Sequence, residues 1–210
     1  MVENILLLIP PILLAITFHE YAHGWMALKF GDPTAKMLGR LSLNPLVHLD
    51  PIGTLMLLIV QFGWAKPVPV DPRYFSDPKK QMIWVALAGP IANMILAFVS
   101  GIFIIIFSSS NLMFNSKTAF FGNILVYSLQ INLALAVFNM LPIPPLDGSK
   151  ILRGLLPYKY EYIANTLEQF GPWILMSLIL FGFISGISIF WLFIGPFVRF
   201  FSSLFTFGLI

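Results

Sequence analysis

Two histidines and a glutamate near the start of the chain have the types and spacing of a metal-dependent hydrolase site. Residues 19–23 read H-E-x-x-H and lie within an apolar run from residue 5 to residue 30. On a helix, His19 and His23 are one turn apart on the same face, so both imidazoles can reach one metal ion. Glu20 points to the neighbouring face, where it can act on a water at the metal. A charged group in the middle of a membrane helix costs about 2.5–3.5 kcal/mol, which favours a functional reason for it.

A catalytic zinc site usually has three protein ligands and one open position, so this pair needs a third ligand. The remaining histidine of the chain is His48, for which an interfacial position satisfied by water or backbone is the favoured interpretation. Asp147 is the better candidate. It follows three prolines in residues 142–145, which we expect to end the preceding helix and leave extended backbone. A helix cap or an Asx turn is the alternative role for Asp147.

The composition is that of an integral membrane protein. The 210 residues are 58% hydrophobic and 10% charged, whereas soluble domains carry about 25% charged residues. The net charge of +3 without a long basic run gives little support to nucleic-acid binding. The absence of cysteine excludes disulfides and thiolate metal sites.

The pattern predicts an all-α membrane protein, a polytopic bundle of four to five transmembrane helices. The predicted spans are Ile5–Phe30, Met82–Phe107, Phe120–Leu141, Phe170–Ile184 and Ile187–Phe207. The apolar segment Ile52–Phe62 is too short to span and predicts a re-entrant or interfacial piece near residues 50–70. Residues 149–169 predict a helical piece on the membrane surface. We expect one membrane domain, with a core over residues 1–150 and the remaining helices over residues 151–210.

The distribution of basic residues supports the re-entrant topology. If Ile52–Phe62 does not span, Lys117 lies on one side and most other basic residues share the opposite side. These are Lys29, Lys36, Arg40, Lys66, Arg73, Lys79, Lys80, Lys150, Arg153 and Lys159. The positive-inside rule makes their side cytoplasmic. The same topology brings Asp147 to the face of the membrane where His19 and His23 lie.

At this point the chain resembles the site-2 proteases, a family of intramembrane zinc metalloproteases. Their H-E-x-x-H is present at residues 19–23, and their N-x-x-P-x-P-x-L-D-G at residues 139–148. The stretch A-G-P-I-A-N at residues 88–93 is similar to the family's G-x-x-x-N, and residues 62–70 resemble its small prokaryotic branch. Many relatives carry a PDZ or CBS domain, for which this chain has no matching segment.

The resemblance implies that His19, His23 and Asp147 bind one zinc ion and that Glu20 is the general base. Asn93 and Asn139 match family positions thought to hold substrate backbone. The implied substrates are transmembrane or juxtamembrane peptides of proteins in the lipid bilayer, and no nucleic acid. The implied location is a prokaryotic cell membrane, with the active site toward the cytoplasmic side.

Other functions remain open on the sequence alone. CAAX-processing and heat-shock zinc proteases also place H-E-x-x-H near membranes, but their third ligand is a downstream glutamate. A zinc-binding scaffold or a transporter is the non-enzymatic alternative, although a transporter predicts paired repeats that this chain does not show. Gly89 and Pro90 are interpreted as a packing site or kink, and Asn132 as a polar contact between helices.

Overall fold

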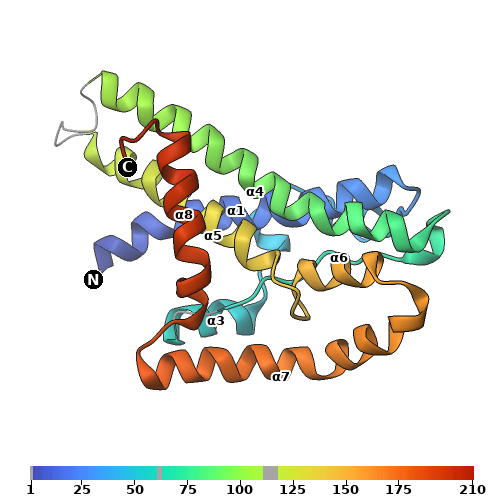
Figure 1. Cartoon of the computed structure of the whole chain (residues 1–210). Helices are drawn as coiled ribbons and strands as arrows, with labels where there is room; N and C mark the ends of the chain where they lie inside the picture. Colours follow the sequence, from blue (N-terminus) through green and yellow to red (C-terminus); the bar gives the residue numbers. More distant parts are fainter. Residues whose placement is uncertain (1, 61–62, 111–117) are drawn as a thin grey trace.

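The computed structural model describes residues 2–60, 63–110 and 118–210, and these residues are predominantly helical (Figure 1). The helices are α1 (Val2–Lys29), α2 (Thr34–Met37), α3 (Pro51–Val60), α4 (Pro78–Ser109), α5 (Ala119–Asn139), α6 (Asp147–Leu155), α7 (Glu161–Ser185) and α8 (Ile189–Phe205). Short 3₁₀ turns occur at Pro45–Val47, Pro72–Tyr74 and Tyr158–Tyr160. The described residues form no β-strand beyond one isolated antiparallel bridge. The all-α prediction is therefore confirmed.

Three helical segments in the described part of the chain are long and apolar enough to cross a membrane: Pro78–Ser109, Ala119–Asn139 and Tyr158–Ser185. They correspond to three of the five predicted spans, of which Phe120–Leu141 extends two residues beyond the end of α5 at Asn139. Helix α1 has 28 residues but carries the H-E-x-x-H, and α8 has 17 residues. Helices α1, α4, α5 and α8 pack together, whereas α7 packs mainly on α6 and the 3₁₀ turn before it.

Helix α7 begins earlier than predicted, at Glu161 rather than at Phe170. The prediction of a separate surface piece over residues 149–169 is therefore only partly right, because its second half continues directly into the span. Gly171 and Pro172 lie inside this helix without ending it. Residues 161–170 contain no proline or glycine, so nothing in them stops a helix from starting before the apolar run.

The region around α3 turns back to the side from which it came. The Lys66 N–H donates to the His48 carbonyl over 2.9 Å, and Leu49 and Ala65 form the antiparallel bridge. The chain entering α3 and the chain leaving it thus lie side by side. A spanning segment would place them on opposite faces, so this pairing agrees with the re-entrant or interfacial prediction. Residues 61 and 62 of the predicted segment lie outside the described residues.

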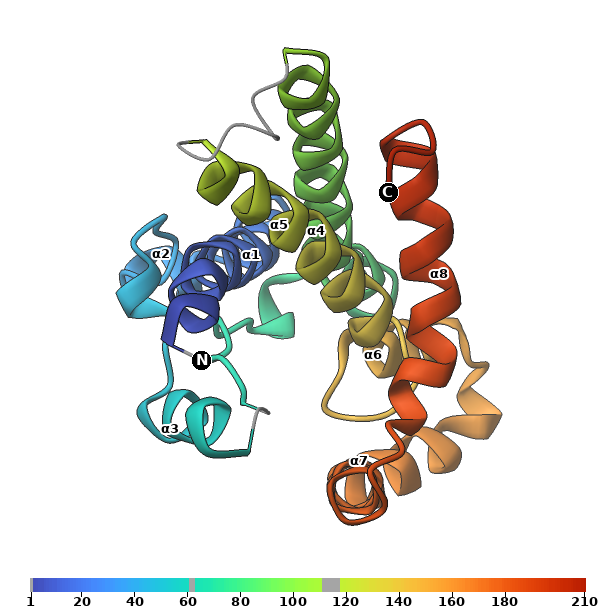
Figure 2. The same cartoon turned by 90° about the vertical axis from the view of Figure 1, so that its left-hand side faces the viewer.

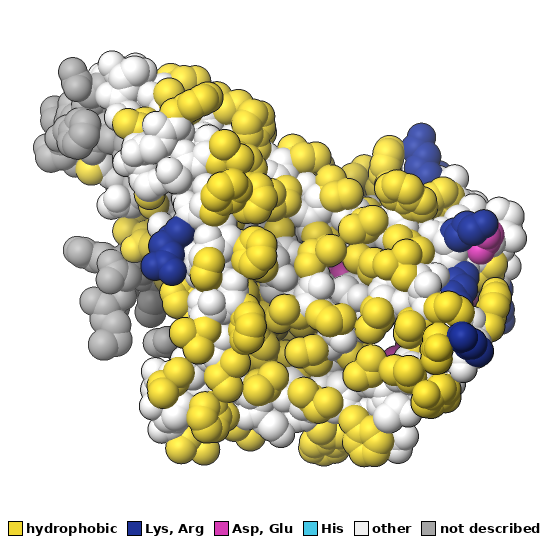
Figure 3. Space-filling model, in the orientation of Figure 1, with side chains coloured by type: hydrophobic (Ala, Val, Ile, Leu, Met, Phe, Trp, Pro, Cys, Tyr) yellow, Lys and Arg dark blue, Asp and Glu magenta, His cyan; other side chains and the backbone are white. Residues whose placement is uncertain are grey.

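The centre of the molecule is built from α1, α4 and α5, which cross one another in both views (Figures 1 and 2). Helix α8 packs on α5 and α4. The fully apolar core cluster lies between α4, α5 and α8 and consists of Ala97, Ile104, Leu129, Leu133, Ile194 and Val198. The outer surface is rich in apolar side chains over α4, α7 and α8 (Figure 3), as expected of a surface that faces lipid.

The loop that leads to Asp147 is not extended, contrary to the prediction for residues 142–146. The Leu146 N–H donates to the carbonyl of Ile143 over 3.0 Å, which closes a turn. Three of these five residues are prolines and have no N–H, so few donors remain and the loop closes as turns. The compact loop therefore keeps Asp147 close to the end of α5.

Candidate metal centre

The structure brings His19, His23 and Asp147 together in the middle of the bundle. The Nε2 atoms of the two histidines lie 3.0 Å apart, and Asp147 Oδ2 lies 3.2 Å from His19 Nε2 and 3.0 Å from His23 Nε2. The three residues are only 8%, 7% and 4% exposed. One helix turn in α1 supplies both imidazoles, and the first residue of α6 supplies the carboxylate.

The surroundings of His19 determine which of its nitrogens carries the proton. Its Nδ1 lies 2.7 Å from Asn93 Oδ1, and Asn93 Nδ2 lies 3.1 Å from the carbonyl oxygen of Ala15. A carbonyl oxygen only accepts, so the Asn93 atom that faces it must be the amide nitrogen. The Asn93 atom facing His19 is then the oxygen, and His19 Nδ1 must donate. The Nε2 lone pair of the neutral ring therefore points toward His23 and Asp147.

His23 has the same protonation pattern for a simpler reason. Its Nδ1 lies 2.7 Å from the carbonyl oxygen of Val85 in α4, so Nδ1 donates. Two imidazole lone pairs and a carboxylate oxygen now face one another within hydrogen-bond distance. Such a set of electron-rich atoms is repulsive in a buried site unless a cation lies among them. The donor arrangement is thus that of a cation site, with both Nδ1–H groups oriented by outer partners, as is usual for metal-binding histidines.

The donor set fits zinc. Two imidazole nitrogens and one carboxylate oxygen are common ligands of a catalytic zinc ion with an open fourth position. Tetrahedral coordination at the usual bond lengths separates two ligand atoms by about 3.3 Å, only slightly more than the 3.0–3.2 Å found here. Asp147 Oδ1 pairs with the Lys150 ammonium over 2.9 Å, and this positive charge favours the carboxylate form of Asp147. Asp147 is therefore available as an anionic ligand.

The position of Asp147 depends on the glycine that follows it. A Cβ on Gly148 would lie 2.2 Å from the carbonyl oxygen of Met140 and 2.5 Å from that of Leu141. Only glycine allows α6 to start this close to the end of α5. Asp147 Oδ1 accepts from Lys150 Nζ over 2.9 Å, whereas no side-chain cap bond occurs at this helix start. The alternative role of Asp147 as a helix cap is therefore not the one found in the structure.

Gly89 permits close packing, as predicted, and the side chains packed against it are the two histidines of the donor cluster. A Cβ on Gly89 would lie 2.4 Å from His23 Nε2 and 2.7 Å from His19 Nε2. The backbone of α4 therefore covers one side of the three donor atoms, and the missing side chain leaves space beside them. The sequence signal was present in A-G-P-I-A-N, but nothing local indicated that this glycine faces α1.

Glu20 lies at the edge of the donor cluster and is held by the segment that returns from α3. Its Oε2 accepts the Val68 N–H over 2.7 Å. Val68 is buried and belongs to the segment between α3 and the 3₁₀ turn at Pro72–Tyr74, which is neither helix nor strand. No other hydrogen bond to the Glu20 carboxylate occurs among the described residues, so Oε1 is available to a ligand.

The two candidate asparagines have different surroundings. Asn93 is fully buried, and its amide contacts His19, Ala15 and Asn132. These bonds fit the polar contact between helices that is the alternative for Asn93, and substrate binding by it stays a prediction. Asn139 is partly exposed and donates to the carbonyl of Leu135 over 3.0 Å. Within the described part of the chain its Oδ1 makes no bond, so it can accept from a substrate.

His48 lies outside the donor cluster. It is fully buried, and its Nε2 lies 2.8 Å from the carbonyl oxygen of Ser42. The expected backbone partner is therefore present for Nε2, whereas the buried Nδ1 has no hydrogen-bond partner among the described residues.

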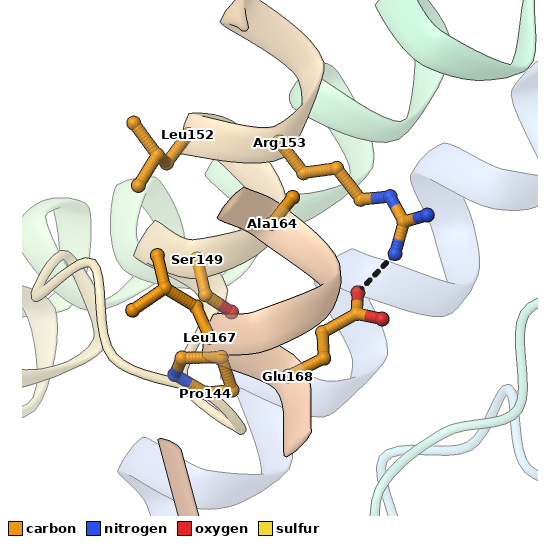
Figure 4. Close-up of a pocket in the computed structure, with 7 residues that line it drawn as sticks. All are labelled: Pro144, Ser149, Leu152, Arg153, Ala164, Leu167 and Glu168. Carbon is orange, nitrogen blue, oxygen red and sulfur yellow. Dashed lines mark hydrogen bonds and ion pairs between the residues drawn. The ribbon is translucent and has the colours of Figure 1, made fainter. Parts of the chain in front are cut away.

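A small cavity lies at the junction of α6 and α7, lined by residues that include Arg153 and Glu168 (Figure 4). Arg153 bonds Glu168 over 2.5 Å and Glu161 over 2.9 Å, and this carboxylate pair raises the pKa of the guanidinium. The cavity beside them measures about 10 Å³, which is room for about one water molecule. A structural tie between the two helices explains these residues.

Comparisons with known proteins point to one family. The model of peptidase family M50 matches residues 7–182. "Putative zinc metalloprotease YwhC" of Bacillus subtilis is 39% identical over 165 residues, which is 78% of this chain and 75% of that protein. "Putative zinc metalloprotease Rip2" of Mycolicibacterium smegmatis is 31% identical over 80% of this chain and 64% of its own length. "Zinc metalloprotease MJ0392" of Methanocaldococcus jannaschii is 28% identical over 81% of this chain, which spans 41% of that longer protein. No solved structure matches the chain.

Proposed function

Because this chain belongs to peptidase family M50, we propose that it hydrolyses peptide bonds within or next to the transmembrane segments of other proteins. The family makes it a membrane-embedded zinc metalloprotease. The observation that carries the proposal is the buried cluster in which two imidazole lone pairs and one carboxylate oxygen converge between membrane helices. A soluble protease would not need to bury this cluster between membrane helices.

In the proposed site, His19, His23 and Asp147 hold the zinc ion. Zinc bound there would lower the pKa of a water molecule to about 7 and polarise the carbonyl of the scissile peptide. The Val85 carbonyl and the Asn93 amide oxygen orient the two imidazoles for this task. The low dielectric of the buried site strengthens every charge interaction in it.

Glu20 acts as the proton carrier. One of its carboxylate oxygens is anchored on the Val68 N–H, so the side chain cannot rotate freely and the other oxygen can accept the proton of the attacking water. The same oxygen then returns the proton to the leaving amine. The anchor also keeps the carboxylate beside the donor cluster instead of within it, so Glu20 stays a base and not a ligand.

Substrates are proposed to enter from the lipid. The surface of the bundle is apolar (Figure 3), and the donor cluster lies beneath it between α1, α4 and α6. A helical substrate must unwind before its peptide carbonyl can be attacked, because helical hydrogen bonds hide it. The amide oxygen of Asn139, near the end of α5, has no partner among the described residues and is proposed to accept a backbone N–H of the unwound segment.

The active site is proposed to lie toward the cytoplasmic side of a prokaryotic cell membrane. The Lys and Arg side chains of one face gather mainly at the end where α4 begins (Figure 3), which includes Lys79 and Lys80. The predicted lone opposite charge, Lys117, lies outside the described residues. The positive-inside rule supports this orientation.

Thiol labelling tests the orientation, since the chain has no cysteine of its own. Lys80→Cys and Ser110→Cys place single thiols at exposed positions near the two ends of α4. A membrane-impermeant maleimide added to intact cells should label Ser110→Cys and spare Lys80→Cys, and inverted vesicles should give the reverse. Labelling of Lys80→Cys from outside would overturn the proposed orientation.

Metal removal tests the function itself. The purified protein, reconstituted in lipid vesicles with single-span peptides, should cleave some of them and contain about one zinc per chain. Chelation should abolish cleavage, and stoichiometric zinc should restore it. Asp147→Ala should contain less zinc and fail to recover, since an anionic ligand is lost. Cleavage that persists after complete metal removal, or full zinc content in Asp147→Ala, would refute the proposal.

A further inference from the structure

A chain of buried polar side chains leads from His19 away from the metal centre. Asn93 in α4 donates through Nδ2 to Asn132 Oδ1 in α5 over 2.8 Å. Asn132 donates through its own Nδ2 to the Ser128 carbonyl over 2.8 Å, and the hydroxyls of Ser128 and Ser100 lie 2.9 Å apart. Asn93 and Asn132 are fully buried, and the two serines are 6% exposed or less.

Backbone carbonyls determine the orientation of the polar groups in this series of side chains. The Ser128 carbonyl only accepts, so the Asn132 atom that faces it is the amide nitrogen, and Oδ1 faces Asn93. Ser100 donates its hydroxyl hydrogen to the Leu96 carbonyl over 2.8 Å, so it accepts from Ser128. Every donor in this series has an acceptor, and the amides cannot be flipped without setting acceptor against acceptor.

We propose that Asn132 is a positioning residue for the metal ligand His19, acting through Asn93. This inference rests on the proposed function, in which His19 binds zinc. Asn93 has two amide hydrogens, one on the Ala15 carbonyl and one on Asn132. Both bonds hold the amide so that Oδ1 receives the His19 Nδ1–H, which leaves Nε2 unprotonated for the metal. Without Asn132 the amide loses one of these two restraints.

Helix α5 therefore supports two of the proposed metal ligands. Asn132 supports His19 through α4, and the loop after Asn139 carries Asp147. Ser128 and Asn132 are four residues apart on one face of α5, and Asn93 and Ser100 are seven apart on the facing side of α4. The polar groups thus link α4 and α5 at two levels, through Asn93 with Asn132 and through Ser100 with Ser128.

Zinc affinity separates a positioning role from a purely structural one. On the full chain in detergent, chelator competition should show that Asn132→Ala binds zinc about 10- to 100-fold more weakly than the unmodified protein. The visible spectrum of the cobalt-loaded variant should also shift, because the ring of His19 is no longer held. Asn132→Asp keeps an oxygen that can accept from Asn93 and should recover part of the affinity.

Two further variants complete the test. Asn132→Leu fills the volume without an acceptor, so it should fold even if the cavity left by alanine is not tolerated, and it should show the same weakening. Ser202→Ala is the matched control. This serine is buried, and its hydroxyl has no hydrogen-bond partner among the described residues, so zinc binding should not change.

The results distinguish the inference from the function on which it rests. Native zinc affinity and an unchanged cobalt spectrum in Asn132→Ala or Asn132→Leu would overturn the positioning role, whatever their melting temperatures. His19→Ala is measured in parallel. If His19→Ala loses zinc while the Asn132 variants keep it, only the inference fails. If His19→Ala keeps zinc, the proposed ligand set fails as well.

Discussion

Glu20→Gln is expected to keep its zinc and to lose peptide cleavage. The glutamine side-chain oxygen can still accept the Val68 N–H that now anchors Glu20, so the local fold should persist. An amide cannot take a proton from the attacking water, and loss of a positioned general base typically lowers the rate by about 10²- to 10⁴-fold. The measurement is single-turnover cleavage of a single-span peptide in vesicles, with zinc content determined on the same sample.

Glu161→Gln is the control for that experiment. Glu161 begins α7 and forms a half-buried ion pair with Arg153 outside the donor cluster, so its replacement should leave the cleavage rate within about a factor of two. Turnover in Glu20→Gln equal to that of Glu161→Gln would exclude Glu20 as the base. Loss of zinc from Glu20→Gln would instead make it a ligand.

Gly89→Ala is expected to be the most damaging single-methyl change near the site. The new Cβ would lie 2.4 Å from His23 Nε2 and within 2.7 Å of two atoms of His19. Either α4 must move away from α1 or both imidazoles must leave their positions. Overpacking of this kind costs about 1–3 kcal/mol, and because it acts on two ligands we expect zinc affinity to fall roughly 5- to 150-fold.

Gly101→Ala is a stringent control because it lies in the same helix and is equally crowded. A Cβ there would lie 2.6 Å from the carbonyl oxygen of Phe205 in α8, far along α4 from the histidines. It should lower the melting temperature yet keep native zinc affinity, measured by chelator competition. Equal loss of zinc in both variants would mean that general loosening of α4, not contact with the ligands, is responsible.

Most of the donor cluster could be predicted from the sequence because its geometry is local. The spacing of His19 and His23 places them on one helix face whatever surrounds them. The L-D-G follows the prolines that end a membrane span, so Asp147 must lie near the end of that span. Counting the spans predicted that Asp147 lies on the same side of the membrane as His19 and His23. Nothing in these steps required knowledge of how the helices pack.

The outer contacts of the site could not be predicted because they depend on how the helices cross. Whether Gly89 faces α1 or lipid is decided by the rotation of α4, and the link from Asn93 to Asn132 by the register of α4 against α5. The hydrophobic periodicity that normally indicates helix rotation is lost when both lipid and core are apolar. The start of α7 was misplaced for a related reason, since hydropathy marks where a helix enters lipid and not where it begins.

The hydrogen bond that anchors Glu20 limits which residues position 68 can carry. Its donor is a main-chain N–H, which every residue at position 68 supplies except proline. Prolines already flank that position at 67 and 69, where the described residues show no need for a donor. Evolution can therefore exchange the side chain of Val68 among apolar residues of similar size, but a third consecutive proline would release the proton carrier without altering any residue that touches the substrate.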